Sequence, residues 1–123
     1  MLQQYRGLIR SLAIYYNPVR QVALRRFYAG LLQPGDLAFD IGAHVGSRAR
    51  AMRAAGARVV ACEPQQPFAG FLRRTLPRDI VLVDQAVGPA TATAHMSVST
   101  RHPTVSSLST TFAAEAAGAH GFT

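Results

Sequence analysis

Apolar residues recur at helical spacing near the start of the chain. Tyr5, Leu8, Ile9 and Leu12 stand at i, i+3, i+4 and i+7, which predicts one apolar stripe of an α-helix. We expect this stripe to pack on the domain that follows.

A second helix is predicted from Asn17-Pro18 to about Leu32. Asn is a favoured N-cap, and Pro is tolerated in the first helical turn. Val22, Phe27 and Leu31 are expected to form its apolar face, and the turn Pro34-Gly35-Asp36 ends it.

The pattern changes from Leu37 onward, where short apolar runs alternate with helical periods. Runs at 37–41, 58–62 and 80–83 predict buried parallel strands. Helical patterns over 47–55 and 68–75 lie between them. The alternation predicts βαβ units with right-handed crossovers, and therefore an α/β fold with a parallel sheet.

A further exposed or edge strand is expected over 91–98, where small polar and apolar residues alternate. His95 and His102 lie in and just after this segment. They match no helical metal-binding pair and lack a nearby acid or cysteine, so we expect no metal site.

Charge excludes one class of nucleotide-binding protein. The net charge is +7, and every basic side chain is arginine. A P-loop needs a lysine, so that motif is absent. The arginines are scattered along the chain instead of clustering with aromatic residues, so we expect no nucleic-acid partner.

The remaining composition indicates a globular chain. No apolar run approaches the roughly 18 residues of a transmembrane helix, and no signal peptide is recognised. The single cysteine, Cys62, has no partner for an internal disulfide, which favours a reducing cytoplasm.

The chain has no acidic residue before Asp36. Residues 1–32 therefore form a basic amphipathic pair of helices, and such segments can lie on an anionic membrane surface. A non-catalytic module acting at membranes is accordingly one alternative function.

The most informative stretch is Asp-Ile-Gly-Ala-His-Val-Gly at 40–46, between the first strand of the sheet and its helix. Ligands of open α/β sheets bind at the carboxyl ends of strands. Gly42 and Gly46 would let the backbone come close to a ligand. The dinucleotide fingerprint G-x-G-x-x-G fails because position 44 is histidine, which argues against the alternative of an NAD-dependent oxidoreductase. Asp40 suits a cationic portion of the ligand, such as the ammonium group of a methionine.

Two further strand ends contribute to the same edge of the sheet. Glu63 follows the second strand about 20 residues after Gly42, the position from which a carboxylate reaches a ribose diol. The third strand ends at Asp84-Gln85-Ala86, where we expect an adenine ring to lie. The candidate cofactor-binding residues are Asp40, Gly42, Ala43, His44, Gly46, Glu63, Pro64, Asp84, Gln85 and Ala86.

In combination, these motifs resemble the FkbM family of methyltransferases. The segments that carry the resemblance are Arg-Phe-Tyr at 26–28, the stretches at 34–48 and 56–65, Ala-Val-Gly at 86–88 and Pro-Thr-Val-Ser-Ser at 103–107. The resemblance implies a Rossmann-like class I fold and transfer of a methyl group from S-adenosylmethionine to a hydroxyl of a small molecule or sugar. It also implies that Asp40, Gly42 and Gly46 line the methionine portion of the cofactor and that Glu63 binds its ribose. His44 stands where this family often has Asn.

The resemblance further implies that a fourth strand and the rest of the sheet would follow, and this sequence ends at Thr123. We therefore expect residues 1–33 to form a helical arm and residues 34–123 a partial methyltransferase domain, with parallel strands in the order 3-2-1. The first strand would be an open edge, and the isolated chain would tend to self-associate. No catalytic base is assigned.

Overall fold

The computed structural model describes residues 2–88, and the chain divides into two compact units. One unit comprises residues 1–10 and 88–123, and the other is Ser11–Val87. The predicted strand over 91–98, together with His95 and His102, lies outside the described residues. The predicted boundary at residue 33 stays a prediction.

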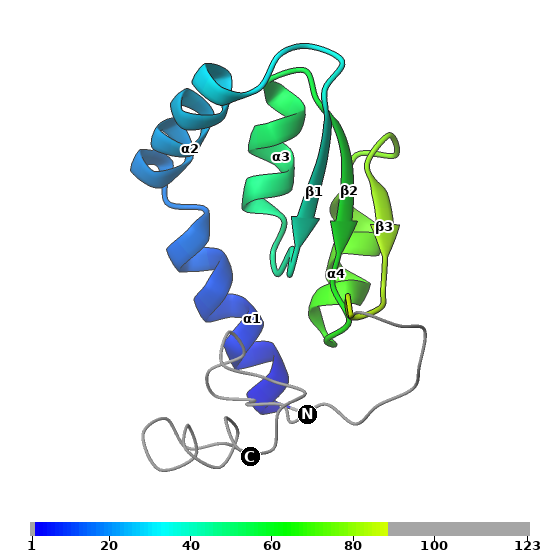
Figure 1. The fold of residues 1–123 in the computed structure, drawn as a ribbon. Coiled ribbons are helices and arrows are strands. Elements are labelled where there is room, and N and C mark those ends of the chain that lie inside the picture. Colours follow the sequence, from blue (N-terminus) through cyan, green and yellow to red (C-terminus); the bar gives the residue numbers. More distant parts are fainter. Residues whose placement is uncertain (1, 89–123) are drawn as a thin grey trace. The chain divides into compact units, whose positions relative to one another are not determined.

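Two helices come first in the chain (Figure 1). Helix α1 spans Leu2–Tyr15 and α2 spans Pro18–Leu31. The Asn17 side chain accepts the Val19 backbone N–H at 2.9 Å, so the predicted N-cap with Pro at the first helical position is confirmed. None of the helices in residues 2–88 is long and apolar enough to span a membrane.

Three parallel strands form the sheet. Strand β1 spans Leu37–Ile41, β2 spans Arg58–Cys62 and β3 spans Val81–Val83. Helix α3 (Ser47–Ala54) connects β1 to β2, and α4 (Phe68–Thr75) connects β2 to β3. The α/β class with a parallel sheet is therefore confirmed, with β3 beginning one residue later than expected.

The observed strand order is β1-β2-β3, where 3-2-1 was expected. The strand order can be read from either edge of the sheet, so both orders place β2 in the middle and leave β1 and β3 as edges. Among the described residues β1 pairs only with β2, from Leu37 opposite Arg58 to Ile41 opposite Cys62.

The buried core lies between the sheet and the two crossover helices. Five of its nine buried residues are alanine, which allows the helices to approach the sheet closely. The cluster of buried residues contains Ala38, Ala43, Ala49, Met52, Ala57, Val59, Ala61, Leu72 and Ile80. Because residues from both α3 and α4 belong to this one cluster, both helices cover the same face of the sheet.

The opposite face of the sheet is exposed, which corrects the expectation of fully buried strands. Burial alternates along β1, with Ala38 and Asp40 buried but Leu37, Phe39 and Ile41 each more than half exposed. Within the described residues no helix packs against these three apolar side chains, so they form an apolar surface.

The apolar face predicted for the second helix is also wrong. Val22, Phe27 and Leu31 are exposed, whereas Tyr28 and Leu32 are the side chains that pack against the core. Helix α2 lies against α3, and the position of α3 selects which side of α2 is covered. In the first helix, Tyr5 and Ile9 of the predicted stripe are exposed as well.

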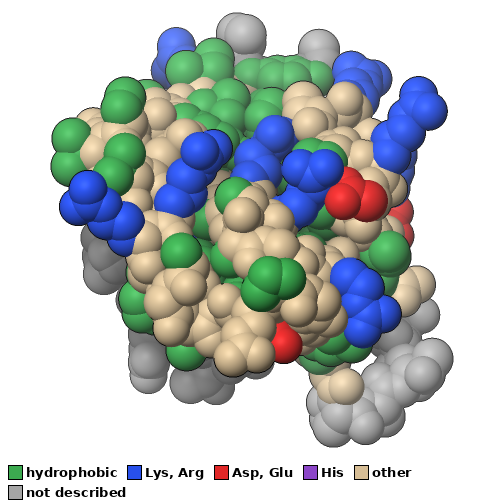
Figure 2. Space-filling view, turned by 90° about the horizontal axis from the view of Figure 1, so that it is seen from above, with side chains coloured by type: hydrophobic (Ala, Val, Ile, Leu, Met, Phe, Trp, Pro, Cys, Tyr) green, Lys and Arg blue, Asp and Glu red, His purple; other side chains and the backbone are tan. Residues whose placement is uncertain are grey.

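Arginines dominate the charged surface. The face of the molecule in Figure 2 carries several arginine side chains, few acidic ones and apolar side chains between them. Two of the described arginines form ion pairs, Arg53 with Asp79 at 2.8 Å and Arg73 with Asp84 at 2.6 Å. Both pairs are exposed, so each contributes little to stability.

Candidate functional site

The carboxyl ends of all three strands meet at one edge of the sheet (Figure 1). Backbone hydrogen bonds join them there: Gly42 and Ala43 both donate to the Cys62 carbonyl at 2.9 Å, and Glu63 donates to the Val83 carbonyl at 2.9 Å. The predicted residues of the first two loops are thus brought together.

Asp40 is buried at the end of β1, with 4% of its surface exposed. Its Oδ2 atom has no hydrogen-bond partner in the described structure. Burial raises the pKa of Asp40, while the Arg48 guanidinium and the Ala49 backbone N–H act in the opposite direction. A buried carboxylate oxygen without a donor is costly, so a ligand that brings a cationic donor would be favoured at this position.

The two glycines of the loop have different roles. Both lie in the left-handed region, Gly42 at φ +76° and Gly46 at φ +81°, where glycine is favoured. A Cβ added to Gly46 would come within 2.9 Å of Leu72 Cδ2, whereas one added to Gly42 would meet nothing within 4 Å. Gly46 is therefore favoured by its positive φ and by close packing against the Leu72 side chain of α4, and Gly42 borders open space that a ligand can enter.

His44 is a packed, neutral side chain. Its ring stacks on Phe68 with centroids 4.2 Å apart and meets the edge of the Tyr15 ring at 5.4 Å. Its Nε2 lies 3.3 Å from Ser11 Oγ. Burial, together with the charge of Arg48, lowers the pKa of His44 to about 4, so the imidazole is uncharged at neutral pH and structural in its contacts.

Glu63 is buried and holds the first two loops together. Its Oε1 accepts the His44 backbone N–H at 2.8 Å, and its Oε2 accepts the Gln65 backbone N–H at 3.0 Å. Burial raises the pKa of Glu63, these two hydrogen bonds lower it, and the nearby charge of Asp40 raises it. Each carboxylate oxygen can accept a second hydrogen bond, so the residue keeps capacity for a ligand hydroxyl.

The end of β3 contributes less than predicted. Asp84, Gln85 and Ala86 are exposed, and Asp84 forms its ion pair with Arg73 of α4. Pro64, after β2, is half-buried. These residues lie at the carboxyl edge of the sheet, but no described contact joins the β3 end to Asp40 or Gly42.

Sequence reasoning missed the aromatic and hydroxyl groups that surround the first loop. Ser11, Tyr15 and Tyr16 come from the end of the first helix, far from the loop in sequence, and Tyr16 donates its hydroxyl to the Val45 carbonyl at 2.7 Å. Nothing in their local pattern signals this role. Among residues 2–88, no three His, Cys, Asp or Glu side chains form a group that could hold a metal ion.

Comparisons with protein-family models, curated proteins and solved structures found no match.

Proposed function

We propose that this chain binds S-adenosylmethionine at the carboxyl edge of its sheet and belongs to a methyltransferase acting on a hydroxyl of a small molecule or sugar. The main supporting observation is the unpartnered, buried Oδ2 of Asp40, which stands two residues before the open position at Gly42. The resemblance to the FkbM family supplies the choice of cofactor.

The described residues fit the cofactor in three respects. Asp40 offers an acceptor for the ammonium group of the methionine portion, and Gly42 leaves room for the ligand to approach the backbone. Glu63 has acceptor capacity for ribose hydroxyls, although its two oxygens already hold backbone N–H groups. The cofactor supplies a methyl group already activated on a sulfonium, so the protein's task is to orient the reactants and exclude water.

The test is calorimetric binding of S-adenosylhomocysteine to the chain and to Asp40→Asn. We expect the variant to bind about 10- to 100-fold more weakly, since a hydrogen bond to a charged group contributes roughly 1.5–3 kcal/mol. Its thermal stability should not fall, because the substitution removes a buried charge whose pKa is raised by burial. Asp79→Asn, which removes an exposed carboxylate from an ion pair, is the matched control and should bind like wild type.

Two results would overturn the proposal. Binding of NADH without binding of S-adenosylhomocysteine would indicate an oxidoreductase instead. Equal affinity of Asp40→Asn and Asp79→Asn would remove Asp40 from the site.

One observation favours a second function, attachment to an anionic membrane surface. Helix α2 exposes Val19, Phe27 and Leu31 at 78%, 61% and 63% of their surfaces. Its charged side chains are all arginine, and arginines are attracted to anionic lipids. Flotation with anionic and neutral vesicles tests this function. Recovery of the chain only in the unbound fraction with both vesicle types would exclude it.

A further inference from the structure

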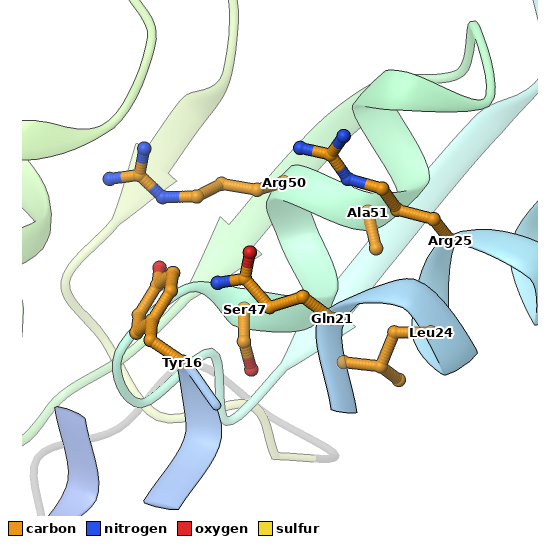
Figure 3. A pocket seen from close by; sticks show the side chains of 7 residues that line it. All are labelled: Tyr16, Gln21, Leu24, Arg25, Ser47, Arg50 and Ala51. Atoms are coloured by element: carbon orange, nitrogen blue, oxygen red, sulfur yellow. The ribbon is translucent and has the colours of Figure 1, made fainter. Parts of the chain in front are cut away.

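A hollow of about 290 Å³ lies between α2 and α3, apart from the candidate cofactor residues. Figure 3 shows side chains of α2 and α3 extending over the same space, with Tyr16 at one side. Its polar lining consists of Tyr16, Gln21, Arg25, Ser47 and Arg50.

The charge of this hollow is positive and uncompensated. Arg25 and Arg50 contribute two guanidinium groups, and no carboxylate is among the lining residues. The ion pairs of the described residues use Arg53 and Arg73 instead. Burial raises the pKa of the Tyr16 phenol, against the lowering effects of the Arg50 charge and hydrogen bond, so this hydroxyl stays neutral and contributes no negative charge.

Arg50 has hydrogen-bonding capacity that the protein does not use. One of its terminal nitrogens donates to the Thr75 carbonyl at 2.8 Å, but its buried Nε–H has no partner in the described structure. A buried donor without an acceptor is costly. An anion in the hollow would offset the positive charges of Arg25 and Arg50 and provide acceptors for their N–H groups.

We propose that this hollow binds the phosphate group of a phosphorylated small molecule. A phosphate monoester carries a charge near −2 at neutral pH and three acceptor oxygens, which matches two guanidinium groups. The Gln21 amide and the Ser47 hydroxyl supply neutral donors beside them. The proposal does not depend on the proposed cofactor site.

The matched variants are Arg25→Gln and Arg26→Gln. Both residues are exposed neighbours on α2 and each variant removes one positive charge, but only Arg25 lines the hollow. Arg50→Gln is the second test variant, with circular dichroism and a thermal melt of all three variants to verify folding.

The experiment titrates the full chain with inorganic phosphate, glycerol 3-phosphate and acetate, followed by calorimetry and by ³¹P NMR of the phosphates. We expect saturable binding of the phosphates, weaker binding of acetate, and a loss of about tenfold or more in Arg25→Gln and Arg50→Gln. Arg26→Gln should remain within about twofold of wild type, since Arg26 does not line the hollow and salt screens exposed charges.

A parallel series uses neutral vesicles with and without phosphatidic acid. Binding only to the phosphatidic acid vesicles, lost in Arg25→Gln and kept in Arg26→Gln, would identify a lipid headgroup as the source of the phosphate. Equal losses in Arg25→Gln and Arg26→Gln, tighter binding of acetate than of phosphate, or no saturable binding of any probe would overturn the proposal.

Discussion

Glu63 accepts the backbone N–H of His44 at 2.8 Å, so the loop after β2 holds the loop after β1 in place. The same carboxylate also accepts the Gln65 N–H. One side chain at a strand end thus fixes the backbone of the two loops that border the candidate site.

Replacing Glu63 should therefore affect folding as well as binding. Glu63→Ala leaves two N–H groups without an acceptor, and we expect a loss of about 2 kcal/mol or more in the free energy of unfolding. Glu63→Gln keeps one carbonyl acceptor and should lose less. Urea denaturation measures both variants, and equal stabilities for the two would contradict the role of the carboxylate in joining the loops.

The stability of the chain should depend on His44 between pH 6.5 and 4. The pKa falls from 6.5 to about 4 on folding. Between these pH values the unfolded chain therefore binds more protons than the folded chain. The contribution of the neutral His44 to the free energy of unfolding is lost as the pH falls. The shift corresponds to about 3 kcal/mol.

The matched variant is His44→Asn, which tolerates the positive φ of this residue and does not titrate. The raised pKa values of Asp40 and Glu63 have the opposite effect on the pH dependence of stability, since the contribution of these carboxyl groups to the free energy of unfolding is lost as the pH rises. Both carboxylates remain in the variant, so the difference between the two stability profiles isolates His44. Parallel profiles for wild type and variant would disprove the assignment.

Gly46→Ala should be strongly destabilising. The added Cβ would lie 2.9 Å from Leu72 Cδ2 in a residue already at positive φ, and we expect a loss of about 2–4 kcal/mol from strain and overpacking. Gly35→Ala is the control, because its φ is +88° but no atom lies within 4 Å of the added Cβ. Equal losses in the two variants would show that the contact with α4 adds nothing.

The exposed face of the sheet should cause self-association. Phe39 of β1 is in register with Val60 of β2, which is in register with Val81 of β3, and Phe39 is 59% exposed. Phe39→Thr keeps a residue that favours strands and should lower the average mass in light scattering at equal protein concentration. Val87→Thr, at a site 57% exposed outside the sheet, should leave the mass unchanged. A monodisperse wild-type monomer at high concentration would refute this prediction.

The sequence predicted where the elements lie because their signals are local. Asn17-Pro18 defines the start of α2, and short apolar runs bounded by glycine or proline define β1 and β2. The pattern could not predict which side of α2 is covered, because that depends on where α3 lies in space. Val22 and Phe27 were therefore assigned to the wrong side of the helix.

The candidate site was predicted in position but not in its contacts. Any acidic residue at the end of β2 satisfies the spacing that identified Glu63, and spacing does not reveal that both of its oxygens hold backbone N–H groups. The stacking of His44 on Phe68 joins the loop after β1 to the start of α4. Such contacts form only when the segments that follow different strands come together in the folded protein. No short stretch of sequence therefore predicts them.

The hydrogen bond from Tyr16 to the Val45 carbonyl bears on which positions of the chain tolerate proteolytic cleavage. Cleavage before Pro18 would remove that donor, and it would also remove Ser11 and Tyr15, two of the three neighbours of the His44 ring. The C-terminal end of α1 and the residue after it thus support the β1–α3 loop. A protein cleaved before Pro18 would keep its sheet, but the backbone of the β1–α3 loop would be less rigid. Any ligand bound at this edge of the sheet would contact that backbone.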